Sequence, residues 1–434
     1  MTDAASTEAE DSTSGGPWIP ASSVAAATWA LFLGLALVMM GNGLNGSVLG
    51  VRSEAEGFGL AVTGVVMASY FAGFLAGTLY AEFALKTVGH IRVFAALASM
   101  ASTAVLIHAL SVNPVTWAIM RFIFGGCMAG LYVVVESWLN DLATNKTRGR
   151  LLSIYMIVTM GGLSLGQLML NIDDESGFRL FVLASVLVSV SLVPVTLSAS
   201  SAPPFAVPEP MGLRDLFKVV PTGIVSSFFT GAATGGLIGM GAVYASAAGL
   251  SQTRISVFLT APLIGAIASQ WPIGWLSDRL PRRGVMFVVA LLGSAGALAA
   301  LSLEDGANGA IIAMGLVGAM LFPLYSLSIA CTNDWIRVEQ ILGASATLIR
   351  INGTGAIVGP LAAAGLMAAF GDRLFFWWIA ASLGAVAAYL LFRIAVKDAL
   401  PFDQQRDYVP FPARASSVAA NLIPRRRRTK RPVV

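Results

Sequence analysis

The chain has 434 residues, of which 56% are hydrophobic and only 12% are charged, and its net charge is +4 at neutral pH. A soluble globular protein carries about 25% charged residues, so this composition predicts a protein that lies largely in lipid. It excludes a secreted disulfide scaffold, a disordered regulator and an ordinary cytosolic enzyme. The two cysteines and two histidines leave too few side chains for most metal or relay chemistry.

The chain begins with a polar, acidic segment over residues 1–21 that lacks the basic start of a signal peptide. We predict a disordered cytosolic tail there. Twelve apolar stretches follow, each close to the ~20 residues that cross a bilayer as a helix. We expect an N-terminal six-helix bundle over 22–199, a cytoplasmic linker over 200–218, a C-terminal six-helix bundle over 219–397 and a basic cytoplasmic tail over 398–434. The stretches are roughly 22–49, 59–81, 93–110, 114–139, 151–170, 178–197, 219–247, 255–277, 285–303, 309–330, 343–370 and 374–395.

Lys and Arg residues are unevenly shared between the two sets of loops. If the N-terminus lies inside, eleven of them fall in inside loops and four in outside loops. The excess of Lys and Arg in cytoplasmic loops predicts that both termini are cytoplasmic, in a multi-pass protein of the cell inner membrane. The inside residues are Lys86, Arg92, Lys146, Arg148, Arg150, Arg214, Lys218, Arg279, Arg282, Arg283 and Arg337, and the outside residues are Arg52, Arg179, Arg254 and Arg373.

The C-terminal tail ends in a cluster of six Arg and Lys residues over 425–431. A nucleic-acid-binding arm is one interpretation. A cluster attracted to anionic lipid, at ~1 kcal/mol for each charge near the membrane surface, is favoured.

The two halves of the sequence resemble each other at a separation of 193 residues. Parallel repeats of six helices are a known transporter architecture. The matches are Leu131-Tyr132 with Leu324-Tyr325, Asn140-Asp141 with Asn333-Asp334, and Gly166 with Gly359.

The loop after the eighth stretch reads Gly274-Trp275-Leu276-Ser277-Asp278-Arg279-Leu280-Pro281-Arg282-Arg283. It resembles the Gly-x-x-x-Asp-Arg-x-Gly-Arg-Arg element of the major facilitator superfamily, with Pro281 in place of the second glycine. The N-terminal copy, residues 82–92, is less similar, because Lys86 stands where the family has Asp. The stretches Arg121-Phe122-Ile123-Phe124-Gly125, Val134-Val135-Glu136-Ser137 and Gln270-Trp271-Pro272-Ile273-Gly274 resemble the family and its YcaD-like bacterial branch.

The resemblance implies an all-α membrane protein of twelve transmembrane helices in two pseudo-symmetric six-helix bundles. A central site would lie between spans one, four, seven and ten. An inner gate would include Gly274, Asp278, Arg279, Arg282 and Arg283.

Three ionisable residues lie at membrane depth, where such residues are hypotheses of function. Arg121 and Glu136 share one face of span four, about 22 Å apart along its axis. Each side chain either extends to its nearer interface or faces the central cavity. Arg350 in span eleven either pairs with Glu136 as a gate residue, contacts substrate or extends to the interface. Glu136 and Glu82 are the only candidates for carrying a coupling proton.

Uncharged polar residues supply the other candidates for substrate contact. Asn42 and Asn45 share a face of span one in a glycine-rich run, and span seven has a similar run. These runs are either packing notches for neighbouring helices or flexible points beside the binding site. The candidate substrate residues are Asn42, Asn45, Arg121, Tyr132, Thr234, Tyr244 and Tyr325.

Other protein classes fit the sequence less well. The Gly-x-Ser-x-Gly match at residues 162–166 lies inside a membrane span, whereas a hydrolase needs it on a strand-to-helix turn. No metalloprotease motif or phosphate-binding loop occurs, and a pseudo-repeat monomer lacks the identical ring of residues expected of an oligomeric pore. We expect a monomeric secondary transporter without cofactor or metal that moves a small organic solute, with efflux slightly favoured and protons as a candidate coupling ion. A facilitative uniporter, an uptake carrier and a lipid flippase are the alternatives.

Overall fold

A computed structural model of the chain describes residues 21–143, 147–172, 178–197, 211–303, 308–396, 405–406 and 408–411. Within these ranges, twelve helices are long and apolar enough to cross a membrane, which confirms the predicted number. The regular structure in these ranges is helical. The predicted tail over residues 1–21, except Ala21 at the start of the first helix, lies outside the described residues, as do most of the linker and of the basic tail, so their boundaries stay predictions.

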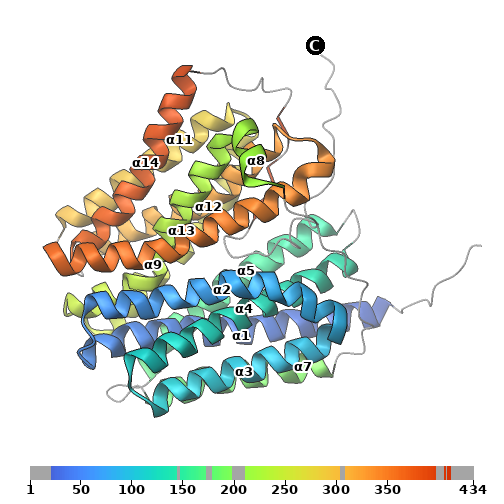
Figure 1. The fold of residues 1–434 in the computed structure, drawn as a ribbon, viewed down its shortest axis with the longest axis vertical. Coiled ribbons are helices and arrows are strands. Elements are labelled where there is room, and N and C mark those ends of the chain that lie inside the picture. The colour runs from blue at the N-terminus through green and yellow to red at the C-terminus, as the bar shows by residue number, and fades with distance from the viewer. Residues whose placement is uncertain are drawn as a thin grey trace, which may run out of the picture.

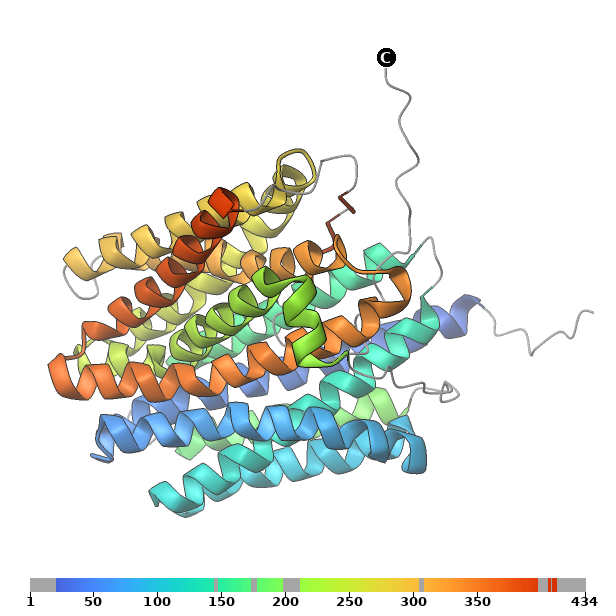
Figure 2. The ribbon, with the colours of Figure 1, turned by 45° about the horizontal axis from the view of Figure 1, so that its top comes forward.

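The helices form two bundles that lie side by side, with the N-terminal one at the bottom of Figure 1 and the C-terminal one above it. The N-half consists of α1 (Ala21–Ala55), α2 (Leu60–Val88), α3 (His90–Leu110), α4 (Pro114–Leu142), α5 (Arg148–Leu168), the 3-10 turn η1 (Met169–Ile172), α6 (Phe178–Val190) and α7 (Leu192–Thr196). The C-half, preceded by the short helix α8 (Leu213–Val219), consists of α9 (Pro221–Ala247), α10 (Gln252–Ser277), α11 (Arg282–Ser302), α12 (Asn308–Asn333), the 3-10 turn η2 (Val338–Gln340), α13 (Ile341–Phe370) and α14 (Leu374–Val396). The turned view keeps the two groups apart by colour, blue to light green below and yellow-green to red above (Figure 2).

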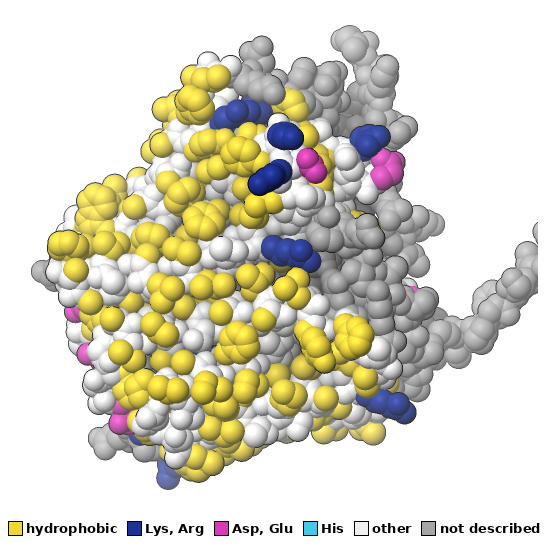
Figure 3. All heavy atoms as spheres, viewed as in Figure 1, with side chains coloured by type: hydrophobic (Ala, Val, Ile, Leu, Met, Phe, Trp, Pro, Cys, Tyr) yellow, Lys and Arg dark blue, Asp and Glu magenta, His cyan; other side chains and the backbone are white. Residues whose placement is uncertain are grey.

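The outside of the bundles is apolar. Figure 3 shows hydrophobic side chains spread over the helices of one face, with few charged groups among them. Many large apolar side chains are exposed, including Trp271, Ile312 and Phe370, each more than 70% accessible. Such a surface is stable in hydrocarbon and would aggregate in water.

Glycines set the distance between α2 and α4. A Cβ atom built on Gly73 would overlap the carbonyl oxygen of Phe122, and one on Gly125 would overlap that of Tyr70. The two backbones therefore touch, as small residues allow at helix interfaces in membranes.

The C-half repeats this contact between α10 and α12. There Gly265 meets the carbonyl of Gly315, and Gly318 meets that of Pro262. Gly265 follows Gly73 by 192 positions, and Gly318 follows Gly125 by 193. The repeat seen in the sequence is therefore a repeat of backbone contacts.

A second pair of helices repeats in the same way. Gly43 on α1 meets the carbonyl of Leu163 on α5, and Gly235 on α9, 192 positions later, meets that of Ala356 on α13. Gly166 and Gly359, one of the matches in the sequence, complete the two contacts from the other helix. The packing interpretation of these glycine runs therefore holds for Gly43 and Gly235.

Two connections differ from expectation. Residues 82–92, expected as a loop, are helical on both sides of Gly89, whose φ of 91° makes the whole turn between α2 and α3. Span six breaks at Ser191 between α6 and α7, because Pro194 has no N–H for the carbonyl of Val190. By contrast, α10 remains one helix through Pro262 and Pro272.

The glycine contacts generate a stability prediction. Gly73→Ala should destabilise the protein by about 1–3 kcal/mol, the usual cost of overpacking, because the added methyl group overlaps a carbonyl of α4. Gly161→Ala in α5 is the matched control, since nothing lies within 4 Å of its Cβ position and alanine favours a helix by ~1 kcal/mol. Thermal denaturation of the detergent-purified variants measures both, and equal melting temperatures would contradict the contact.

Candidate functional site

The two halves meet along a seam formed by α1 with α9, α2 with α13 and α5 with α10. Hydrogen bonds join them where α5 ends and α10 begins. Asn171 Nδ2 donates to Ser256 Oγ at 2.8 Å, and Gln252 Nε2 donates to the carbonyl of Leu170. We call this the seam end, and the opposite end, where α8 and residues 405–411 lie, the linker end.

A cavity lies in the seam and takes its lining from both halves. The N-half contributes residues of α1, α2, α4 and α5, and the C-half contributes residues of α9 and α10. Its polar side chains are Asn42, Ser47, Tyr70, Arg121 and Gln167.

Arg121 is the charged group of this cavity. Its guanidinium carbon lies 4.6 Å from the centre of the Tyr70 ring, and its Nη2 lies 3.8 Å from the sulfur of Met67. The Tyr70 hydroxyl accepts a hydrogen bond from Asn42 Nδ2 at 3.4 Å. Arg121 is 4% exposed and does not extend to an interface. A buried guanidinium over an aromatic face, with an amide nearby, suits an anionic group attached to an apolar or aromatic body.

A second cavity lies between α2, α9 and α13. Tyr70 and Phe71 line both cavities. The second one also contains Thr234, a predicted substrate residue, and Asn352, whose Nδ2 donates to the carbonyl of Ser227 at 3.0 Å. Tyr70 and Asn352 were not predicted from the sequence.

Four other predicted substrate residues line neither cavity. Asn45 is fully buried, and its amide has no hydrogen-bond partner among the described residues. The Tyr132 hydroxyl donates to the sulfur of Met39 at 2.9 Å. Tyr244 packs into the C-half against aromatic rings, including a stacked one 5.0 Å away. Tyr325 is buried beside the segment that contains residues 408–411.

Glu136 is fully buried on α4 and accepts a hydrogen bond from the Tyr155 hydroxyl at 2.5 Å. Arg350, by contrast, is exposed on α13 and makes no ion pair with Glu136 among the described residues. The structure therefore does not bring these two predicted gate residues together.

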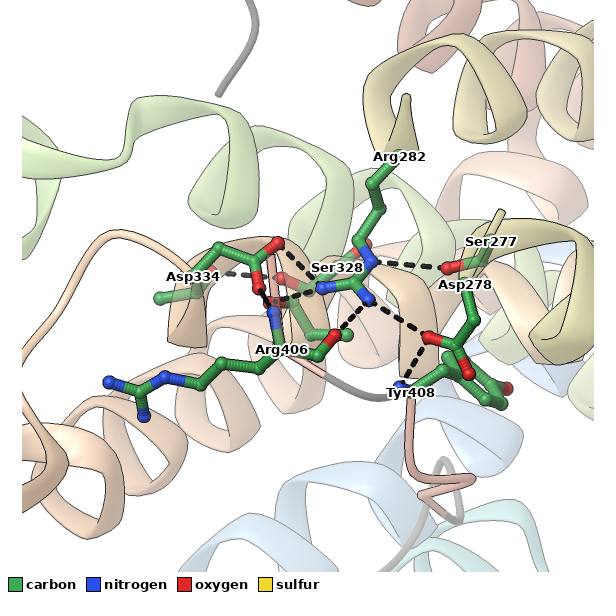
Figure 4. A network of polar contacts seen from close by, with 9 residues as sticks. Ser277, Asp278, Arg282, Ser328, Asp334, Arg406 and Tyr408 are labelled. Atoms are coloured by element: carbon green, nitrogen blue, oxygen red, sulfur yellow. Dashed lines mark hydrogen bonds and ion pairs between the residues drawn. The ribbon is translucent and has the colours of Figure 1, made fainter. Parts of the chain in front are cut away.

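The predicted gate loop forms a network at the linker end, drawn in Figure 4. Arg282 lies at its centre, 2% exposed, and its Nη1 pairs with Asp334 Oδ2 at 2.5 Å. Its Nη2 lies 3.5 Å from Asp278 and donates to the carbonyl of Arg406 at 2.6 Å. Asp278 also accepts from the backbone N–H of Tyr408 at 2.7 Å. Asp278 and Arg282 are thus in contact, with Asp334 as the second carboxylate.

The other gate residues surround the network. Gly274 contacts the ring of Tyr408, which would overlap a Cβ atom at that position. Arg279 is exposed and lies 3.7 Å from the Trp275 ring, while buried Arg283 lies 5.2 Å from the Trp335 ring.

Asp334 lies just beyond α12, where burial raises the pKa of its carboxyl above the usual value. The ion pair with Arg282 and the N–H of Arg406, which donates at 2.8 Å, oppose this rise. Asp334 is the repeat partner of Asp141, so the repeat could have signalled it. No pattern in the tail signals Arg406 or Tyr408.

Metal chemistry has no support in the described part of the chain, where no group of three His, Cys, Asp or Glu side chains could hold an ion.

The chain matches the family model described as the Major Facilitator Superfamily over residues 31–251 and again over 223–433. The MFS-type transporter YcaD of Escherichia fergusonii is 27% identical over 337 residues, which cover 76% of this chain and 86% of that protein. YcaD of Escherichia coli O9:H4 is 28% identical over 334 residues, with the same coverage.

Solved structures are similar in fold. The nucleoside transporter NupG has a TM-score of 0.68 at 13% identity, over 86% of this chain and 100% of that one. A bacterial homolog of the human lysosomal transporter Spinster, inward-facing and unoccupied, has a TM-score of 0.64 at 17% identity, over 93% and 98%. At such identities the likeness shows the fold alone.

The network predicts that Arg282→Gln is strongly destabilising. Removing one partner of a buried ion pair costs about 3–5 kcal/mol, because Asp334 is left buried without its cation. Arg279→Gln is the matched control, since Arg279 is exposed in the same loop. Thermal denaturation should show a large loss for the first variant only, and a melting temperature of Arg282→Gln equal to that of the control would refute the pairing.

Proposed function

The chain belongs to the major facilitator superfamily, whose members are membrane transporters rather than enzymes, and we propose that it is a secondary active transporter that works by alternating access. Its substrate is a small organic solute with an anionic group and an apolar body. The observation that carries this proposal is a buried arginine in a cavity lined by both halves. Rocking of one half against the other would expose Arg121 to each side in turn. Efflux is slightly favoured over uptake, by family analogy.

Placement in the membrane is part of the proposal. The protein crosses the inner membrane as a monomer, with both termini in the cytoplasm and the linker end on the cytoplasmic side. The support is the distribution of Lys and Arg; the face in Figure 3 has several of these residues near α8. The basic residues over 425–431, outside the described part of the chain, would contact anionic lipid.

Protons are the proposed coupling ion, with Glu136 as their carrier. Among the described residues, Glu136 is the one acidic side chain that is buried within a span. It accepts a hydrogen bond from the hydroxyl of Tyr155 on α5. A carboxylate there can alternate between a charged and a neutral form as the halves move.

The first test concerns Arg121. A thermal-shift screen of purified protein against organic anions should identify a ligand, and Arg121→Gln should abolish its binding and its flux into liposomes while folding is retained. Arg52→Gln is the control, because Arg52 pairs with Glu56 at the surface. Undiminished flux by Arg121→Gln would remove this residue from the site, and lipid scrambling without solute flux would favour a flippase.

The second test concerns Glu136. Glu136→Gln should abolish accumulation driven by a pH gradient but retain exchange of labelled for unlabelled substrate, because exchange needs no net proton movement. Glu339→Gln, an exposed carboxylate at the linker end, is the control. Gradient-driven accumulation by Glu136→Gln would exclude this residue as the proton carrier, and insensitivity of the unsubstituted protein to pH gradients would favour a uniporter.

A further inference from the structure

A short piece of the C-terminal tail lies on the C-half at the linker end. Residues 405–406 and 408–411 pack against α10, α12 and the residues that follow α12. We call this piece the strap. Its backbone supplies donors and an acceptor to the Arg282 network.

The network holds the strap at two points. Asp334 accepts from the N–H of Arg406, and Asp278 accepts from the N–H of Tyr408. Between them, Arg282 donates to the carbonyl of Arg406 at 2.6 Å. Asp278 and Arg282 of the predicted gate, and Asp334 beside them, are therefore engaged by the tail (Figure 4).

Two aromatic side chains anchor the strap. Phe411 is 1% exposed, and the Ser326 hydroxyl bonds to both its N–H and its carbonyl, at 2.9 and 2.8 Å. The Tyr408 hydroxyl accepts a hydrogen bond from Gln270 at 2.9 Å, and its ring covers Gly274. The strap thus has a built binding surface on the C-half.

This surface is particular to the C-half. By the repeat separation of 192 or 193, the N-half has Val133 in place of Ser326, Thr78 in place of Gln270 and Lys86 in place of Asp278. None of these three preserves the group that binds the strap. The contact between the strap and the C-half therefore has no counterpart in the N-half, and it does not follow from the duplication of the six-helix unit.

The strap lies close to the seam. The ring of Phe411 is 6.3 Å from that of Tyr325 on α12, which is one of the four spans expected to line the central site. Closure of the linker end by alternating access would bring the N-half toward α12. The strap engages Asp278 and Arg282 of the predicted inner gate at that end.

We propose that the strap is an autoinhibitory element that holds the linker end apart and must leave its surface before the two halves can close there. The inference rests on the alternating access proposed above. Release of the strap would remove the backbone groups of Arg406 and Tyr408 from Asp278, Arg282 and Asp334, so that these side chains could take part in the closed gate. Transport would then be regulated by whatever displaces the tail.

The test measures a distance and needs no substrate. Spin labels are attached at Thr87→Cys and Glu339→Cys, two exposed positions at the linker end of different halves, after the buried Cys127 and Cys331 are replaced by Ala. In lipid nanodiscs, Phe411→Ala should raise the ratio of the population with the short label-to-label distance to the population with the long one. The expected rise is about tenfold or more, equivalent to ~1.4 kcal/mol. Tyr408→Ala, measured separately, should give the same result. Phe392→Ala removes a ring that is 57% exposed on α14 and should match the unsubstituted protein.

Each outcome decides the proposal. A larger short-distance population in both strap variants supports it. An unchanged distance distribution, with or without a lower melting temperature, overturns it. The strap would then only stabilise the fold of the C-half. If Phe411→Ala does not fold, Tyr408→Ala and Phe411→Leu decide in its place. Because no solute is involved, failure here leaves the Arg121 test of transport untouched.

Discussion

Contact between helix backbones at glycine is the constraint on which the structure depends. In hydrocarbon, apolar side chains gain little by leaving lipid, so helices associate where their surfaces fit closely. Gly73 and Gly125 provide that fit in the N-half, and Gly265 and Gly318 provide it in the C-half. Each half is thereby tied together internally by contacts with backbone carbonyls, whereas in the seam Gly50 and Gly64 meet the side chains of Ala242 and Ala364. The cavities lie in that seam.

The two charged groups on α4 lie in separate regions of the molecule. Arg121 lies beside Tyr70 in the cavity, and Glu136, fifteen residues on and about 22 Å away along the axis, is held by Tyr155. Each charge is stabilised by a tyrosine of a neighbouring helix, and neither is neutralised by the other. A single helix therefore carries, at different depths, both the anion site and the proton carrier that we propose.

The sequence was sufficient for the fold because length and hydropathy specify membrane helices directly. The cavity was predicted only in part. Asn42, Arg121 and Thr234 line the cavities as expected, whereas Tyr244 packs into the C-half. A helix that is apolar all round has no polar face to fix its rotation, so which side of it meets the cavity depends on partners distant in the chain. The strap was not predictable, because its binding depends on Asp278 after α10 together with Ser326 and Asp334 at α12, and these two parts of the chain come together only on folding.

The prolines of α10 have a mechanical consequence. Pro262 and Pro272 cannot donate a backbone hydrogen bond, so the carbonyls four residues before them, at 258 and 268, have no helical partner. Such positions are points of low bending stiffness. One of them lies next to the Gly318 contact and the other just before the loop that holds the strap. α10 can therefore bend at two points, so its two ends need not rotate through the same angle when the halves move.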